Sequence, residues 1–385
     1  LAIDGKGYVG MGLDSNSQWH NDWYQYDPVN NSWSQKASLP SAARDHCSSF
    51  VVDSLGYIIA GEISGGAINE VWQYNASNDS WVQKTGLTGG ARESGAGFVL
   101  NGKIYFGTGY VGGSNLDDFY MYDPANDSWT QKTNVPGGIR NAAVGLSVGG
   151  RGYLGLGAYT NGQTFHTDFY EYDTSNGGSW TQKADYPMPN GGASSYQSAD
   201  AGYVLCGSFE QHSGGITTNP LNLLYKYTPA NDTWSLQGSF PGLPRCYAGE
   251  FSINKDIYFG LGTQTLGAQQ IIPGHTSMLG DFWKLAYIID SLPLAIATDH
   301  HNERSAGSVK IFPNPSHDYL NISIEAINIL SVVRIYDATG KLVDELTVTS
   351  DNPEQLDISK LAIGTYYAEL VGKNKEIYTS KFIKE

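Results

Sequence analysis

A unit of about 50 residues repeats along most of the chain, and this repeat limits the possible folds more than any other feature. Each copy opens with a glycine-rich apolar strand that carries a tyrosine, and the six tyrosines are Tyr8, Tyr57, Tyr105, Tyr153, Tyr203 and Tyr258. The first five copies continue with an aromatic-x-Tyr strand, a polar turn and a strand with a tryptophan. These tryptophans are Trp33, Trp81, Trp129, Trp180 and Trp234. The pattern predicts one four-stranded sheet per copy, with tight turns between the strands.

A sheet of this size has apolar faces that it cannot bury alone, so the copies must stack on one another. Radial stacking closes six sheets into a ring, which predicts an all-β, six-bladed β-propeller over residues 1–287. We expect the tyrosines and tryptophans of the repeat to pack between neighbouring blades, where each buries roughly 150–250 Å². The 47 glycines and 26 tyrosines agree with sheets joined by tight turns.

The glycines of the repeat follow a pattern of their own. A Gly-x-Gly triplet ends the tyrosine-bearing strand in several copies, as at residues 10–12 (Gly-Met-Gly) and 107–109 (Gly-Thr-Gly). Together with the repeat tyrosine and tryptophan, this pattern resembles the Kelch repeat, which has a glycine doublet at this position. The resemblance covers residues 1–287 and implies a Kelch-type propeller. Gly-x-Gly in place of Gly-Gly still permits close approach of the backbone.

The first and last copies are incomplete in complementary ways. The first copy has only Ala2 and Ile3 in the position of its innermost strand, and the last copy lacks a tryptophan-bearing outer strand after residues 281–287. The Kelch resemblance implies that a strand from one end of the chain completes the blade that the other end begins. The chain opens at Leu1 without a signal peptide, which we interpret as a processed or truncated N-terminus, and a seventh blade upstream stays open.

A second domain follows a polar stretch without a period, residues 288–307, which we interpret as a linker. Residues 308–385 contain short alternating strands at intervals of about ten residues, a pattern that predicts a small β-sandwich. Four motifs mark this domain: Phe-Pro-Asn-Pro at 312–315, Tyr-Asp-x-x-Gly-Lys at 336–341, Leu-x-x-Gly-Thr-Tyr-Tyr at 361–367 and Lys-Phe-Ile-Lys at 381–384.

In their order, these motifs closely resemble the C-terminal sorting domain of substrates of the type IX secretion system of Bacteroidota. The resemblance implies that a signal peptide directs the chain across the inner membrane and that the type IX secretion machinery then recognises residues 308–385. We therefore expect an extracellular protein or one on the outer-membrane surface. Whether the sorting domain is cleaved or the protein is anchored stays open.

The charge balance and the cysteines exclude several other classes. A formal net charge of −15 argues against nucleic acid as a partner, because phosphate backbones require a basic surface. No apolar run approaches the ~18 residues of a membrane span. Cys47, Cys206 and Cys246 form no CxxC pair and are interpreted as buried free thiols. We expect no cofactor and no metal, and we expect a monomer.

Four arginines stand in register with the repeat, each thirteen residues before a repeat tyrosine: Arg44, Arg92, Arg140 and Arg245. The fifth copy has Asn190 at this position. In a propeller these residues begin the innermost strands and ring the mouth of the central channel, together with the adjacent Asp45, Glu93 and Asn141. Two roles stay open: the arginines bind an acidic ligand through their forked donors, or they hold neighbouring blades together.

The loops between the second and third strands of each blade should meet the same face. They contain the aromatic residues Trp19, Tyr110 and Tyr159, which are candidates for stacking on sugar rings. They also contain four histidines, His20, His166, His212 and His275, none of which has a second histidine at metal-ligand spacing. We select the aromatic residues, with the arginines and their neighbours, as ligand-binding candidates and assign no catalytic residue.

The leading hypothesis is a non-catalytic extracellular binding module that recognises a glycan or a surface protein at the channel mouth. The alternative is a carbohydrate-active enzyme that resembles the sialic acid mutarotases or galactose oxidase, and a structural surface protein is the third option. Glu93 beside Arg92 would suit a carboxylate sugar with a general base nearby, whereas no cysteine fits the copper site of the oxidase. A carboxylate with a raised pKa at the channel mouth would favour the enzyme.

Overall fold

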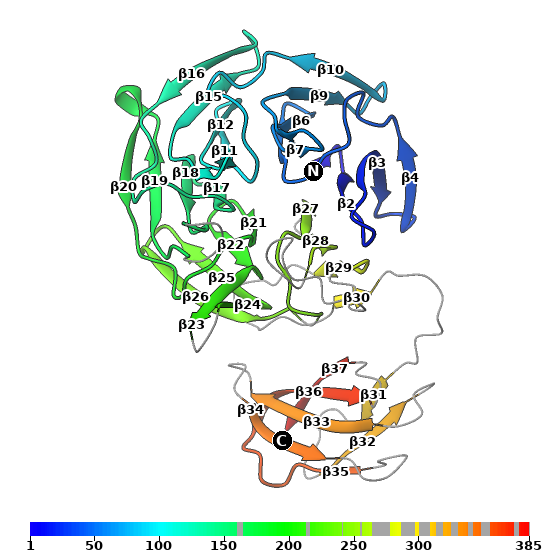
Figure 1. Ribbon diagram of the computed structural model, residues 1–385. Coiled ribbons are helices and arrows are strands. Elements are labelled where there is room, and N and C mark those ends of the chain that lie inside the picture. The colour runs from blue at the N-terminus through cyan, green and yellow to red at the C-terminus, as the bar shows by residue number, and fades with distance from the viewer. Residues whose placement is uncertain are drawn as a thin grey trace.

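The structure is a computed structural model, and its described residues are almost entirely strands and turns. The described residues are 1–159, 165–212, 216–240, 242–254, 256–263, 278–285, 297–299, 309–312, 319–324, 330–337, 342–347, 355–372 and 377–384. The repeat forms six four-stranded antiparallel sheets arranged as blades around a central channel (Figure 1). The prediction of a six-bladed propeller is therefore confirmed.

The first three blades follow the chain from its N-terminus, and each runs from the channel outward in strand order. Blade 1 contains β1 (Ala2–Ile3), β2 (Lys6–Leu13), β3 (Trp19–Asp27) and β4 (Ser32–Lys36). Blade 2 contains β5 (Ser48–Val52), β6 (Leu55–Ile59), β9 (Val71–Asn75) and β10 (Ser80–Lys84). Blade 3 contains β11 (Ala96–Leu100), β12 (Lys103–Gly107), β15 (Phe119–Asp123) and β16 (Ser128–Lys132).

The other three blades repeat this order. Blade 4 contains β17 (Val144–Val148), β18 (Arg151–Gly155), β19 (Phe169–Asp173) and β20 (Ser179–Gln182), with a short 3-10 turn η1 (Ser175–Gly177) before β20. Blade 5 contains β21 (Ser194–Gln197), β22 (Gly202–Leu205), β25 (Leu223–Thr228) and β26 (Thr233–Ser239). Blade 6 contains β27 (Gly249–Ile253), β28 (Asp256–Gly260), β29 (Phe282–Leu285) and β30 (Ala297–Asp299).

The last blade differs from the sequence-based expectation. Its outer position is filled by β30, which pairs antiparallel with β29 and lies inside the stretch 288–307 that we interpreted as a linker. The repeat does not reveal this strand because β30 lacks the tryptophan that the other outer strands carry. The ring closes where β27 of blade 6 meets β1 and β2 of blade 1, and Tyr26 of blade 1 packs against Tyr258 and Phe282 of blade 6.

Tyrosine and tryptophan side chains join each blade to the next, as the repeat predicts. Tyr74 is fully buried and donates its hydroxyl to Asp79, and the same carboxylate accepts the backbone N–H of Ala37 in the preceding blade. The indole N–H of Trp81 donates to the carbonyl of Ala37 at 2.7 Å. Equivalent indole bonds join Trp129 to Thr85, Trp180 to Thr133 and Trp234 to Ala184. These tyrosines and tryptophans of the repeat therefore stabilise the ring of blades rather than face a ligand.

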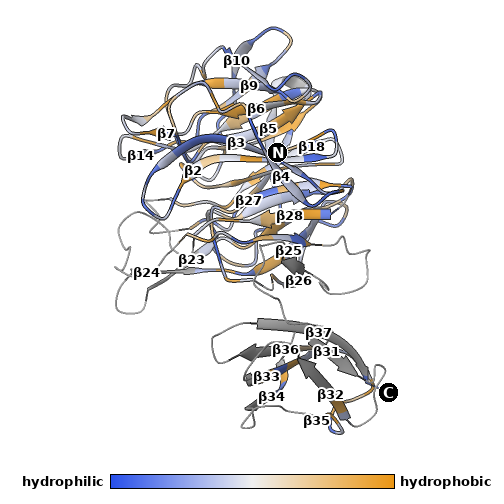
Figure 2. Ribbon diagram, turned by 90° about the vertical axis from the view of Figure 1, so that its right-hand side faces the viewer, coloured by the Kyte–Doolittle hydropathy of each residue, from blue (hydrophilic) through white to orange (hydrophobic). Residues whose placement is uncertain are grey.

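Three two-stranded hairpins project from the loops between the second and third strands: β7 (Glu62–Ile63) with β8 (Gly66–Ala67), β13 (Tyr110–Val111) with β14 (Ser114–Asn115), and β23 (Ser208–His212) with β24 (Ile216–Pro220). In the edge-on view of Figure 2, β7, β14, β23 and β24 all lie on one side of the disc. We call this side the loop face. The segments that lead into the innermost strands also end there.

Residues 308–385 contain two further sheets. One sheet has the order β31 (Val309–Phe312), β32 (Tyr319–Ile324) and β35 (Gln355–Asp357). The other has the order β34 (Leu342–Thr347), β33 (Leu330–Asp337), β36 (Gly364–Gly372) and β37 (Ile377–Lys384). Leu320, Val333, Ile335 and Ala368 are fully buried within this domain. Within the described parts of the whole chain, no helix is long and apolar enough to cross a membrane.

Candidate functional site at the channel mouth

Backbone hydrogen bonds join each blade to the next at the loop face. The second glycine of the Gly-x-Gly triplet donates its N–H to the carbonyl of the in-register residue in the next blade, as from Gly12 to Arg44 and from Gly109 to Arg140 (2.8 Å each). Gly61, which follows Ile59 and Ala60 instead of a first glycine, makes the same bond to Arg92 at 3.0 Å. Gly109 has a φ of +103°, and a Cβ at this position would lie only 2.6 Å from the carbonyl oxygen of Glu93. The triplet therefore needs glycine for both its conformation and its close contact.

The four in-register arginines are fully buried, with no exposed surface. Arg92 binds both carboxylate oxygens of Asp118 at 2.6 and 2.9 Å, and Arg140 binds both oxygens of Asp168 at 2.6 and 2.8 Å. Arg44 pairs with Glu70 at 2.6 Å and Arg245 with Asp281 at 2.5 Å. Each carboxylate stands just before the third strand of the same blade, so the pair ties the entry of the first strand to the entry of the third.

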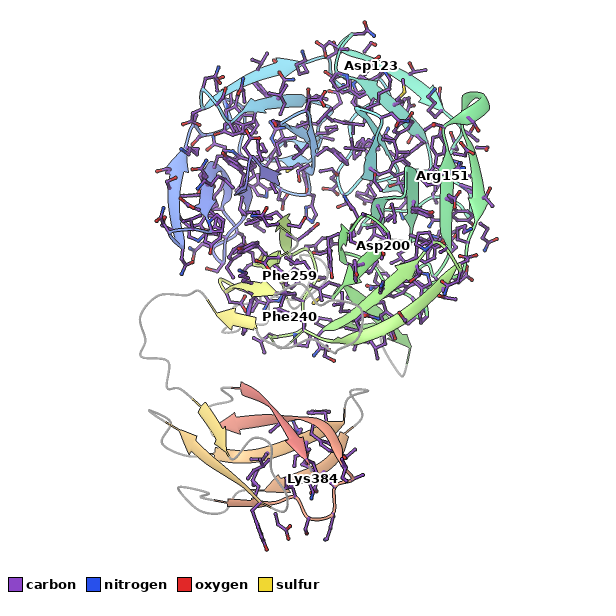
Figure 3. The ribbon with its side chains drawn as sticks, turned by 180° about the vertical axis from the view of Figure 1, so that it is seen from behind. Asp123, Arg151, Asp200, Phe240, Phe259 and Lys384 are labelled. Atoms are coloured by element: carbon purple, nitrogen blue, oxygen red, sulfur yellow. The ribbon has the colours of Figure 1, made fainter. Side chains whose placement is uncertain are left out.

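Several other donors of these arginines bind backbone carbonyls, whereas Nη1 of Arg44 and Nε of Arg92 are buried without a hydrogen-bond partner. Arg92 also donates to the carbonyl of Thr108 at 3.1 Å. In the fifth blade, the amide of Asn190 replaces the guanidinium and donates to the equivalent carbonyl of Cys206 at 3.0 Å. Arg245 is further stacked near Phe240 and Phe259, whose positions Figure 3 labels. Because the arginines are buried and paired with carboxylates of their own blades, their geometry fits a packing role within each blade rather than between neighbouring blades, and it leaves no guanidinium for an acidic ligand.

A second set of hydrogen bonds joins the blades two residues after the in-register positions, where every residue has a positive φ. The backbone N–H of Ser94 donates to the carbonyl of His46, and Ala142, Gly192 and Tyr247 each donate in turn to the equivalent carbonyl of the preceding blade, at 2.8–2.9 Å. The rings of His46 and Tyr247 meet edge to face at 5.3 Å between centroids, across the position of blade 1. The backbone bonds therefore run from His46 to Tyr247 around the channel mouth, and the contact between the rings of these two residues spans the remaining gap.

Four titratable side chains gather on this rim: Asp45, His46, Glu62 and Glu93. Asp45 and Glu62 exchange two backbone hydrogen bonds at 3.0 and 3.1 Å, so the entry of β5 lies beside the start of the β7–β8 hairpin. Glu93 makes the equivalent pair with Tyr110 at 2.9 and 3.0 Å. The side chain of Asp45 is 12% exposed and that of His46 is 34% exposed, so the group is crowded but open to the channel.

Burial and close neighbours shift the pKa of two of these groups, Glu93 and His46. Burial, followed by the hydrogen bond with Glu62, raises the pKa of Glu93 to about 7 against the opposing effect of His46. Burial lowers the pKa of His46, but the adjacent Asp45, with Nδ1 and Oδ1 3.1 Å apart, and the charges of Glu93 and Glu62 outweigh this and raise it. We call Asp45, His46, Glu62 and Glu93 the rim cluster.

Three members of the rim cluster lie close enough together to be considered as metal ligands. Asp45, His46 and Glu62 offer ligand atoms within 4.8 Å of one another. Among the described residues, no other group of three or more histidine, cysteine, aspartate or glutamate side chains has its ligand atoms within this distance. The group of Asp45, His46 and Glu62 contains a single histidine and no tyrosine, which does not fit the copper site of galactose oxidase. Because these atoms already pair as His46 with Asp45 and Glu62 with Glu93, we assign no metal to them.

The predicted aromatic residues lie at different places on the loop face. Trp19 lines a groove of about 450 Å³ between blades 1 and 2, together with residues 17 and 18, Ala42, Ala43 and residues 63–65. Tyr110 is half-buried beside Glu93, and Tyr159 is 43% exposed in blade 4, edge-on to His166. The residues of the groove neighbour the rim cluster along the chain, because Asp45 follows Ala42 and Ala43 closely and Glu62 directly precedes residues 63–65.

The two loop histidines whose side chains the structure describes, His20 and His166, lie in different blades. His20 lies 3.2 Å from Asp14 in blade 1, and His166 lies 3.7 Å from Asp168 in blade 4. The side chains of His212 and His275 lie outside the described residues. Asn141, also a candidate, donates its amide to Asn115 at 2.7 Å and so completes the packing of blade 3 against blade 4.

The cysteines are buried or half-buried and carry no disulfide. Burial raises the pKa of the Cys47 thiol to about 11 and that of Cys246 to about 12, so neither forms a thiolate near neutral pH. Burial also raises the pKa of Cys206. These thiols are packing groups.

Sequence reasoning missed His46 and Glu62. Their signal lies in the register of the repeat: His46 stands two residues after Arg44, and Glu62 stands five residues after Tyr57. Tyr110 stands five residues after Tyr105 in the next copy. Isolated bridges in blades 2 to 6 pair the residue just after the in-register position with the residue five after the repeat tyrosine, as in Asp45 with Glu62 and Glu93 with Tyr110. Comparison of these two columns would have revealed the rim cluster.

Comparison with protein families agrees with both parts of the chain. Residues 2–148 match the model of the KLHDC2/KLHL20/DRC7 Kelch-repeats domain. Residues 310–385 match the model of the secretion system C-terminal sorting domain.

Two individual proteins are also similar to the chain. The endo-acting ulvan lyase of Formosa agariphila is 31% identical over 101 residues, which are 26% of this chain and 18% of that protein. The chain therefore spans less than a fifth of the relative's length. The solved structure of YjhT superposes with a TM-score of 0.64 at 19% identity and covers 76% of this chain and 95% of that chain. At that identity the likeness shows the propeller fold alone.

Proposed function

Because the chain is a Kelch-type β-propeller followed by a secretion-system C-terminal sorting domain, we propose that it is an exported binding protein that captures a glycan at the loop face. The observation that carries this proposal is the pairing of an uncharged groove beside Trp19 with the partly open rim cluster. Sites for sugars combine an aromatic wall with a few convergent polar groups in this way. The name of the ulvan lyase, a relative over part of the chain, also points to glycans.

Export follows from the sorting domain in this proposal. We propose that residues 308–385 fold as a unit of their own and are recognised by the type IX secretion machinery, which places the propeller outside the cell or on its surface. The propeller then performs the binding, and the sorting domain supplies only the destination.

A glycan microarray probed with the full chain tests the binding function. We expect at least one glycan to be captured, and we expect Asp45→Asn, at the rim, to weaken that capture. Asp200→Asn is the matched control, because Asp200 lies in the turn between β21 and β22 at the opposite end of the innermost strands (Figure 3). The proposal fails if no glycan binds, or if Asp200→Asn weakens binding and Asp45→Asn does not.

The rim cluster favours a second candidate, an enzyme that transfers protons on a bound sugar. A carboxylic acid whose pKa is raised to about 7 can both donate and accept a proton near neutral pH, and Glu93 has Glu62 as its hydrogen-bonded partner. Interconversion of sugar anomers is a reaction of this class.

Exchange spectroscopy by NMR on the captured sugar distinguishes the two candidates. An enzyme should raise the rate of anomer exchange above that in buffer, and Glu93→Gln should remove the increase while capture persists. An exchange rate equal to that in buffer would contradict the enzyme and leave binding as the function of the protein.

A further inference from the structure

The groove between blades 1 and 2 has the shape and chemistry of a subsite for one sugar unit. Trp19 supplies an aromatic wall, and Ala42, Ala43 and Gly65 keep the space beside it open. Ser17, Gln18 and Ser64 supply hydroxyl and amide groups around that wall. A sugar ring presents an apolar C–H face and a polar edge of hydroxyls, so it matches a stacking ring with hydrogen-bonding groups at its border.

The charges around the groove select against an anionic sugar. The residues that line the groove include no charged side chain, and the chain continues from its walls into Asp45 and Glu62. The nearest histidines, His20 and His46, each lie against a carboxylate.

The guanidinium of Arg44, which follows Ala42 and Ala43, is buried and paired with Glu70. The whole chain carries a net charge of −15. A sulfate or uronate group in the groove would therefore meet acidic neighbours and no free cation among the described residues that form it.

We infer that this groove binds a neutral sugar unit stacked on Trp19 and rejects sulfated and uronate-bearing chains. The inference rests on the proposed glycan-binding function and adds the class of glycan and the place of contact. It also replaces the preference for acidic ligands that the in-register arginines suggested from the sequence.

Titration calorimetry of the full chain tests the inference. The titrants are two neutral polysaccharides, laminarin and a mannan, and ulvan as the sulfated, uronate-bearing probe. We expect a neutral polysaccharide to bind and Trp19→Ala to weaken it by about tenfold or more, the size of effect typical of a central aromatic contact. Tyr319→Ala is the control, since Tyr319 is an exposed aromatic residue of β32, outside the propeller.

A second variant fills the groove without removing the tryptophan. A Cβ added at Gly65 meets no atom within 4 Å, and its φ lies outside the left-handed region, so Gly65→Leu should fold normally and still block the groove. Gly280→Leu is its control, because Gly280 is equally open and belongs to the loop before β29 of blade 6. We expect Gly65→Leu to reduce binding as strongly as Trp19→Ala, and Gly280→Leu to leave it unchanged.

The outcomes separate the inference from the function on which it rests. If ulvan binds more tightly than the neutral polysaccharides, the inference is wrong and the glycan-binding function stands. If a neutral polysaccharide binds but neither Trp19→Ala nor Gly65→Leu weakens its binding, the sugar does not bind in the groove and the inference is wrong. If none of a broad set of neutral and anionic glycans binds, both the inference and the proposed function fail.

Discussion

Replacement of Arg140 by alanine tests whether the in-register arginines stabilise the blades that contain them. The guanidinium is fully buried and makes two hydrogen bonds to Asp168 at 2.6 and 2.8 Å, and it also donates to the carbonyls of Leu156 and Pro136 at 3.2 and 3.0 Å. Arg140→Ala removes all of these and leaves Asp168, only 16% exposed, without its cation. Removal of one partner of a buried ion pair costs about 3–5 kcal/mol.

Urea unfolding of the full chain measures this loss, and thermal unfolding should show a fall of roughly 6–15 °C for a domain of this size. Arg151→Ala is the control in the same blade: Arg151 is 43% exposed and pairs with Asp173 at the surface, so its loss should change stability little. Arg140→Met combined with Asp168→Leu should recover part of the loss, because no unpaired charge is left buried.

The opposite result would refute this reasoning. If Arg140→Ala leaves the free energy of unfolding within about 1 kcal/mol of wild type and abolishes glycan capture, the arginines contact ligand and do not serve as packing groups.

Three further predictions concern the rim, the triplet and the second domain. Glu93 has a folded-state pKa of about 7 against an ordinary value of 4.5, so its ionisation destabilises the fold increasingly from pH 4.5 to 7 and fully above that. Glu93→Gln should therefore stabilise the chain at pH 8, by on the order of 1–2 kcal/mol after allowance for partial exposure. The same variant should not stabilise the chain at pH 4. Gly109→Ala should cost more than about 1 kcal/mol, read from urea unfolding, because its φ is positive and its Cβ would meet the carbonyl of Glu93. Deletion of residues 308–385 should leave the melting temperature of the propeller within a few degrees of that in the full chain and abolish surface appearance in the producing bacterium; a fall of tens of degrees would contradict separate folding.

The architecture could be predicted from the sequence because each blade repeats the same local chemistry. Tyr74 and Trp81 pack as their positions in the repeat predict, and the motifs of residues 308–385 are contiguous in sequence. The outer strand of blade 6 could not be predicted, because β30 is held by backbone pairing to β29 and carries no side-chain signal.

The site was harder to predict because it depends on which partners meet across loops. The register placed Arg92 at the mouth, but its role is decided by Asp118, which lies 26 residues later and buries the guanidinium charge. Likewise, Glu62 and Glu93 come from different blades, and burial together with their approach across the rim raises the pKa of Glu93. A repeat predicts positions well, whereas burial and pairing at those positions depend on tertiary contacts.

A crystal structure of the full chain in complex with the neutral oligosaccharide that binds best tests the central claim most directly. The account predicts electron density for a sugar ring stacked on Trp19 in the groove between blades 1 and 2, with the chain of sugars continuing toward Asp45 and Glu62 at the rim. Density at the opposite face of the propeller, or on residues 308–385, would contradict it.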